Sequence, residues 1–184
     1  MSRIPPKPLK DYPWYLRIFY RYQKKKYGSP LMPTLLWGRV PKLLRLFLRF
    51  VRFFERKGSP LSPSLRALVM IRASQINECH FCIDLNAQAL LEREGDLHKF
   101  EGLANYQENS LFSEKERCAL EYAEVMSQSD QKVTDALFNR LKKHFSEDAI
   151  IELTGLIAFQ NLSSKFNVAL DVEAHGFCRT ENFP

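Results

Sequence analysis

Apolar residues recur at helical spacing along most of this chain, and no stretch shows the strict alternation of a half-buried strand. Helix start and stop signals, among them Pro13, Gly28 and Pro41, divide the pattern into segments. These segments cover approximately residues 13–28, 41–57, 63–76, 79–95, 114–128, 135–145 and 147–173. The sequence therefore predicts an all-α bundle of roughly seven helices.

A domain boundary is predicted at the stretch GSPLSPS, because Ser62 and Pro63 match the N-cap and the first residue of a new helix. We expect residues 1–57 to form an N-terminal helical extension that packs on the core domain. The core domain is predicted to span residues 58–176, and residues 177–184 are predicted to form a tail.

The charge of the chain is divided unevenly between these parts. Residues 1–57 hold 15 Lys or Arg and two acidic residues, a net charge of +13, whereas residues 58–184 carry −7. Four of the basic residues form one stripe on an otherwise apolar helix: Arg45, Arg49, Arg52 and Arg56. Such a helix is normally buried in a core or between subunits. Docking on nucleic acid or on an anionic membrane surface is the alternative that the charge leaves open.

Cysteine usage depends on the compartment, and we expect this chain to be cytoplasmic. The first residues lack the apolar stretch of a signal peptide, and no later apolar run reaches the roughly 18 residues of a membrane span. In the cytoplasm the four cysteines are expected to be reduced: Cys79, Cys82, Cys118 and Cys178. A close pair of cysteines there favours a catalytic, redox-sensing or metal-binding role.

The stretch INECHFCIDLN carries such a pair, Cys79 and Cys82, three residues apart and hence on one helix face. A short break near Asn77 and Glu78 would place both thiols at the start of a new helix. Unpaired backbone amides and the helix dipole stabilise a thiolate at that end, and the thiolate is the reactive form. We therefore expect a redox-active pair.

Three other interpretations of the pair remain open. A thioredoxin-type site has the same spacing, but it follows a strand, and the pattern predicts none. A zinc site would need Cys118, Cys178 or His80 to complete the ligand set, and none has paired spacing. The two cysteines would otherwise be small core residues.

From about Tyr27 to Leu170 the chain resembles the carboxymuconolactone decarboxylase family, specifically its alkylhydroperoxidase D-like branch. The resemblance is carried by YGSPLMPTLLWGRVPKLL, SPLSPSLRALVMIRASQINECHFCIDLN, FSEKERCALEYAEVM and LFNRLKKHFSEDAIIELTGLIAFQNLSSKFNVAL. It implies an all-helical fold, assembly into trimers or hexamers, and a peroxidase-like oxidoreductase activity in antioxidant defence. This chemistry calls for no bound cofactor or metal.

The resemblance also implies roles for the two thiols. Cys82 corresponds to the thiol that attacks the hydroperoxide, and Cys79 to the one that then closes a disulfide. Position alone would favour Cys79 as the attacker, because it lies nearer the helix end. An external dithiol, on a lipoyl-bearing or thioredoxin-like protein, would reduce the disulfide. The alternatives are a decarboxylating lyase, which does not need vicinal cysteines, and a non-enzymatic redox-responsive binding protein.

The chain departs from the family pattern at two positions. Relatives commonly carry a histidine where this chain has Asn86, and a glutamate where it has Ala67; the two residues form a proton relay. Asn86 holds a hydrogen bond but cannot take up a proton. A relay would have to be rebuilt from other groups.

Candidate replacements lie close to the cysteines in sequence or on the next long helix: His80, Asp84, Glu78, Glu121 and Glu124. We expect Asp84 or Glu124 to lie within hydrogen-bond reach of Cys82. Cys118 is expected to be a core residue and Cys178 a tail residue.

Overall fold

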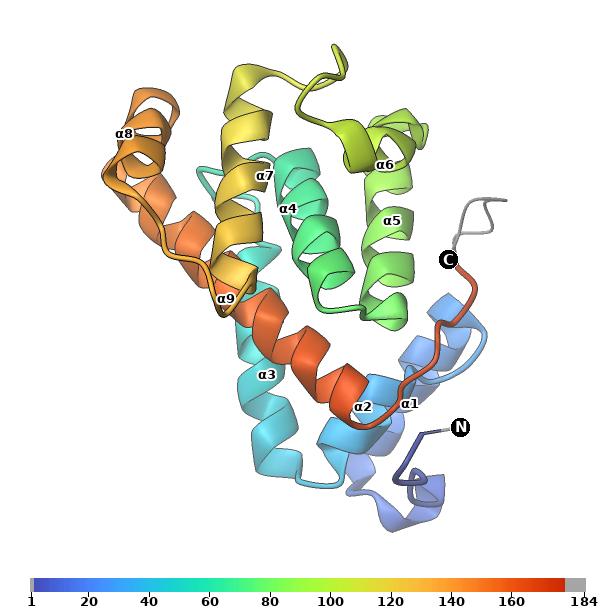
Figure 1. Ribbon diagram of the computed structural model, residues 1–184. Coiled ribbons are helices and arrows are strands. Elements are labelled where there is room, and N and C mark those ends of the chain that lie inside the picture. The colour runs from blue at the N-terminus through green and yellow to red at the C-terminus, as the bar shows by residue number, and fades with distance from the viewer. Residues whose placement is uncertain (1, 178–184) are drawn as a thin grey trace. The chain divides into compact units, whose positions relative to one another are not determined.

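A computed structural model describes residues 2–177 of the chain (Figure 1). This part contains nine α-helices, two 3-10 helices and no strand, so the all-α prediction is confirmed. The α-helices are α1 (Trp14–Tyr27), α2 (Met32–Gly38), α3 (Pro41–Phe54), α4 (Pro63–Ile76), α5 (His80–Glu94), α6 (His98–Glu101), α7 (Glu114–Ser127), α8 (Asp135–His144) and α9 (Glu147–Ala169). The 3-10 helices are Leu9–Asp11 and Gly102–Asn105. No helix in this part of the chain is long and apolar enough to cross a bilayer.

Local capping explains why most helix starts match the prediction. The Ser62 side chain accepts a hydrogen bond from the Leu65 amide at the start of α4, and Ser113 forms a capping box with Glu116 at the start of α7. Gly95 ends α5 in the left-handed conformation, with φ of 84°, which glycine adopts without steric cost.

Three features of the helix pattern differ from the prediction. Helices α2 and α6 were not predicted; they have seven and four residues, too few to show a periodic pattern. Helix α9 ends at Ala169 rather than near residue 173. The chain leaves the helix there, and Asp171 has a positive φ of 55°.

The described chain divides into two compact units. The first contains the residues up to Arg56 together with Ala169–Glu173. Two buried tyrosines join α2 to the part of the chain before it. The Tyr12 hydroxyl donates to the Leu35 carbonyl at 2.9 Å. The Tyr20 hydroxyl of α1 donates to the Thr34 carbonyl at 3.0 Å.

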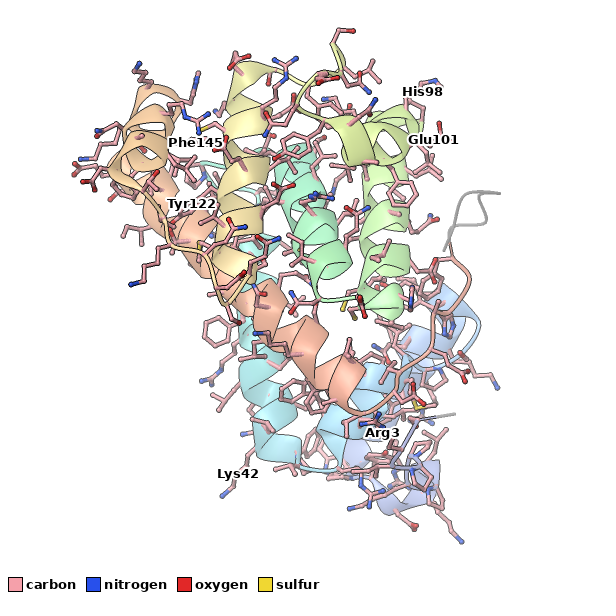
Figure 2. All side chains as sticks on the ribbon, in the orientation of Figure 1. Arg3, Lys42, His98, Glu101, Tyr122 and Phe145 are labelled. Carbon is pink, nitrogen blue, oxygen red and sulfur yellow. The ribbon has the colours of Figure 1, made fainter. Side chains whose placement is uncertain are left out.

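The second unit contains Lys57–Val168 and the residues from Ala174 onward. Helix α4 is its central element and packs against α5 and α7 (Figure 1). The buried apolar cluster comprises Ala67, Leu68, Ile71, Ile83, Ala87, Leu90, Phe100, Leu103, Tyr106, Phe112 and Leu120. Tyr122 of α7 is labelled in Figure 2, and a hydrogen bond of 2.9 Å between its hydroxyl and that of Thr154 ties α9 to α7. The thiol pair lies in this unit.

Candidate active site

Both thiols lie at the start of α5, in the turn that follows α4. Helix α4 ends at Ile76, Glu78 turns the chain with a φ of 53°, and Cys79 is the N-cap residue of α5. The Cys82 amide donates a hydrogen bond to the Cys79 sulfur over 3.3 Å. The predicted helix break, and the position of the pair at a helix start, are therefore confirmed. Both side chains are buried and neither is in a disulfide.

Asn77 fixes the turn that precedes the thiols. Its side-chain amide donates to the Ala73 carbonyl and to Asn161 Oδ1 of α9, in both cases at 2.7 Å. Asn161 in turn donates to the hydroxyl of Ser127 on α7 at 3.0 Å. Side chains of α7, α9 and the C-cap residue of α4 therefore hold the backbone where α5 begins.

The polar partners of the thiols come from α9. The side-chain amide of Asn167 donates to the Cys82 sulfur at 3.2 Å and, at 3.7 Å, to the Cys79 sulfur. The Ser163 and Ser164 side chains also form hydrogen bonds with Cys82. All of these partners are neutral, so the sulfur is stabilised by oriented dipoles rather than by a positive charge.

Gln160 orients one of these donors. Its Nε2 donates to the hydroxyl oxygens of Ser74 and Ser164, both at 2.9 Å. The Ser74 hydroxyl in turn donates to the Met70 carbonyl at 2.6 Å. Because the Ser164 oxygen accepts from Gln160, the hydroxyl hydrogen of Ser164 remains free to point at the Cys82 sulfur.

The two thiols differ in acidity. Burial alone would raise the pKa of Cys82, but hydrogen bonds from Cys79 and from the α9 side chains outweigh it and lower this pKa from 9.0 to about 7. The pKa of Cys79 is raised, because its thiol donates to Cys82, is itself buried, and lies beside a sulfur that ionises first. The pair therefore favours a thiolate at Cys82 and a protonated thiol at Cys79.

Asn86 and His80 lie on α5 near the pair, and their roles differ from those of the α9 side chains. The Asn86 side-chain amide donates to the backbone carbonyl of Cys82 at 2.8 Å, so it supports the first turn of α5. His80 is the first residue of α5 and is exposed. Ala67 is fully buried in the apolar cluster, a position where a glutamate would be desolvated.

The two predicted carboxylates have partners of their own, and a contact of either one with Cys82 stays a prediction. Asp84 is fully buried, and its Oδ2 accepts three consecutive backbone N–H groups, those of His175, Gly176 and Phe177, over 2.7–3.0 Å. It therefore anchors the segment that follows α9. Glu124 accepts from Arg72 Nε at 2.6 Å.

The remaining candidates lie away from the pair. Glu121 forms an ion pair with Arg140. Cys118 is a buried residue of α7 whose pKa is raised by burial. Cys178 lies outside the described residues. Within residues 2–177 no group of three or more His, Cys, Asp or Glu side chains is arranged to hold a metal ion.

Four residues of the site were not predicted from the sequence: Gln160, Ser163, Ser164 and Asn167. Gln160, Ser164 and Asn167 stand four and three residues apart on one face of a long apolar helix, and all three are buried. A stripe of polar residues at such spacing was the available signal, because buried polar side chains require partners.

Comparison with known proteins places the chain in a family. The model of the carboxymuconolactone decarboxylase family matches residues 41–125. The uncharacterized protein YnjA of Escherichia coli (strain K12) is 44% identical over 172 residues, which cover 94% of each chain. The chain belongs to the carboxymuconolactone decarboxylase family.

Solved structures show the same fold as this family member. An alkylhydroperoxidase AhpD core structure, of a peroxidase-related protein from Ralstonia eutropha JMP134, superposes with a TM-score of 0.81 at 21% identity, covering 99% of this chain and 94% of that one. A cysteine-to-alanine variant of the debrominase Bmp8, in complex with 2,3,4-tribromopyrrole, gives a TM-score of 0.82 at 22% identity and covers 95% of both chains. At these identities the likeness concerns the fold alone.

Proposed function

We propose that this protein is a thiol-dependent, alkylhydroperoxidase-like oxidoreductase of antioxidant defence, with Cys82 as the attacking thiolate and Cys79 as the resolving thiol. The observation that carries the proposal is the geometry of the pair: two free, buried thiols lie at the start of α5, and Asn167 Nδ2 donates to the Cys82 sulfur at 3.2 Å. These surroundings lower the pKa of Cys82 and raise that of Cys79. A peroxidase of this kind needs one thiolate and one nearby thiol.

The first step would be attack of the Cys82 thiolate on the terminal oxygen of a hydroperoxide. The O–O bond breaks, Cys82 becomes a sulfenic acid, and an alkoxide leaves. The alkoxide takes the proton of Cys79, which the raised pKa of that thiol keeps available, and departs as an alcohol. The leaving group therefore obtains its proton within the pair, and the hydrogen bonds that lower the pKa of Cys82 favour its thiolate without the histidine that Asn86 replaces.

The second step would be attack of the resulting Cys79 thiolate on the Cys82 sulfur. The S–O bond breaks, hydroxide leaves and becomes water with a proton from solvent, and a Cys79–Cys82 disulfide forms. An external dithiol, on a lipoyl-bearing or thioredoxin-like protein in the cytoplasm, then reduces the disulfide and restores the pair.

Assembly into a trimer or hexamer is part of the proposal. Four apolar side chains of α3, at spacings of three, four and three residues, are between 41% and 54% exposed: Leu43, Leu46, Phe50 and Phe53. A stripe with this spacing suits packing against another helix. We propose a second copy as its occupant, with nucleic acid or a membrane surface as the alternative for the basic extension.

Turnover of an organic hydroperoxide tests the proposal. The reduced protein should consume cumene hydroperoxide with dihydrolipoamide as reductant, and Cys82→Ser should abolish turnover. Cys79→Ser should complete a single oxidation and then accumulate a sulfenic acid that dimedone traps. Cys118→Ser is the matched control and should keep full activity. Equal turnover by the Cys82→Ser variant and the wild-type protein would refute the assigned roles.

The family name leaves decarboxylation of a lactone as a second candidate. That reaction does not use a thiol pair, so a Cys79→Ser/Cys82→Ser double variant should retain it. Redox-dependent binding without turnover is a third candidate, and salt-sensitive binding to a polyanion that changes on oxidation would favour it. Hydroperoxide turnover that depends on Cys82 excludes this purely non-enzymatic role.

A further inference from the structure

Asn167 presents two chemically different atoms beside the thiol pair. Its Nδ2 donates to both sulfurs, whereas its Oδ1 is buried and accepts no hydrogen bond from the described residues. The side chain is 1% exposed. Buried carbonyl oxygens are nearly always hydrogen-bonded, and a catalytic role is one explanation for those that are not.

The position of Oδ1 suits a ligand that contacts Cys82. Oδ1 and Nδ2 share one carbon atom, and Nδ2 lies 3.2 Å from the Cys82 sulfur. Oδ1 is therefore close enough to that sulfur for one small ligand to contact both atoms. The ligand must carry a donor, because a carbonyl oxygen only accepts.

We propose that Asn167 Oδ1 is a substrate-binding atom that accepts the O–H of a hydroperoxide and so positions its terminal oxygen against the Cys82 sulfur. The inference rests on the proposed function and names one contact of that function. The thiolate electron pair forms the S–O bond as the O–O bond breaks, and the hydrogen stays on the transferred oxygen. The same O–H that the substrate donates to Oδ1 therefore becomes the O–H of the Cys82 sulfenic acid.

This arrangement gives Asn167 two separable effects. Its Nδ2 favours the thiolate, which benefits every reaction of Cys82. Its Oδ1 favours only reagents that carry a donor next to the electrophilic atom. Methyl iodide has no hydrogen-bond donor, so it reports the thiolate alone, whereas cumene hydroperoxide reports both effects.

The test compares the two reagents in an Asn167→Ala variant. Second-order rate constants for Cys82 of the reduced protein would be measured from pH 6 to pH 10, with mass spectrometry for alkylation and stopped-flow kinetics for peroxide reduction. At pH 7 both rates should fall. At pH 10 alkylation should return to the wild-type rate, while peroxide reduction should stay about tenfold slower, as expected for one lost hydrogen bond.

Ser164→Ala is the matched control, because it removes a donor to Cys82 but leaves Oδ1 in place. In that variant both rates should recover together at pH 10. If both rates also recover together in Asn167→Ala, the inference is overturned while the peroxidase proposal stands. If the wild-type protein is alkylated but does not react with the hydroperoxide, the inference and the peroxidase proposal are both overturned. Asn167→Leu, which has a similar volume and no polar atom, carries the same expectations and replaces Asn167→Ala should that variant fail to fold.

Discussion

Replacing Ser164 by alanine should raise the pKa of Cys82. Ser164 is fully buried, accepts from Gln160 at 2.9 Å, and forms one of the hydrogen bonds that lower this pKa to about 7. A hydrogen bond to a charged group contributes about 1.5–3 kcal/mol. At about 1.4 kcal/mol per unit, its loss corresponds to roughly one to two pKa units. We therefore expect a pKa between about 8 and 9 in Ser164→Ala.

The rate of Cys82 alkylation by iodoacetamide measures this shift. At pH 7 the thiolate fraction should fall from about half in the wild-type protein to between about a tenth and a hundredth in the variant. Alkylation at pH 7 should then slow by roughly 5- to 50-fold and return to the wild-type rate near pH 10. The midpoint of the rate against pH gives the pKa directly.

Ser127→Ala provides the control for this measurement. Ser127 is also a buried serine and accepts from Asn161 of α9 at 3.0 Å, but that hydrogen bond does not reach a thiol. The variant should keep the wild-type midpoint. If Ser164→Ala keeps the wild-type midpoint as well, the α9 hydroxyl does not set the ionisation of Cys82, and the electrostatic reasoning is wrong.

Three further predictions follow from described contacts. The folded-state pKa of Cys82 lies below the unfolded value of 9.0, so ionisation of Cys82 should add about 2 kcal/mol to the unfolding free energy of the reduced protein from pH 7 to pH 9. The raised pKa values of Cys79 and Cys118 act in the opposite direction and leave a smaller net rise. Urea denaturation would show this rise, and Cys82→Ala should abolish it. Asp84→Ala should speed amide hydrogen exchange at residues 175–177, because three backbone donors lose their acceptor; unchanged exchange would contradict the anchor. The control Glu121→Ala should leave that exchange unaltered. Leu46→Glu with Phe50→Glu should yield monomers by light scattering, since both side chains lie on the exposed stripe of α3, and an unchanged mass would refute that interface.

The sequence predicted the long helices because their signals are local. Caps such as Ser62 and Ser113 lie within one turn of the amides that they satisfy, and apolar spacing persists over several turns. The short helix α2 gave no such signal. The turn before Cys79 was also predicted, since the residues that make it adjoin the thiols.

The partners of the thiols could not be predicted in the same way. Asn167 lies 85 residues after Cys82, and only the packing of α9 brings it to the sulfur. Sequence reasoning sought a titratable replacement for the relay histidine and named Asp84 and Glu124. The structure supplies neutral donors from α9 instead, and Asp84 binds backbone amides more than 90 residues away.

The neutrality of the α9 donors has a consequence for kinetics. Asn167, Ser163 and Ser164 neither gain nor lose a proton in water near neutrality. Oxidation of the reduced protein by a peroxide should therefore follow a single sigmoid with one inflection, set by Cys82, and then level off in alkali, because the raised pKa of Cys79 keeps that thiol protonated. A histidine that donated a proton to the leaving group would add a descending limb and make the profile bell-shaped.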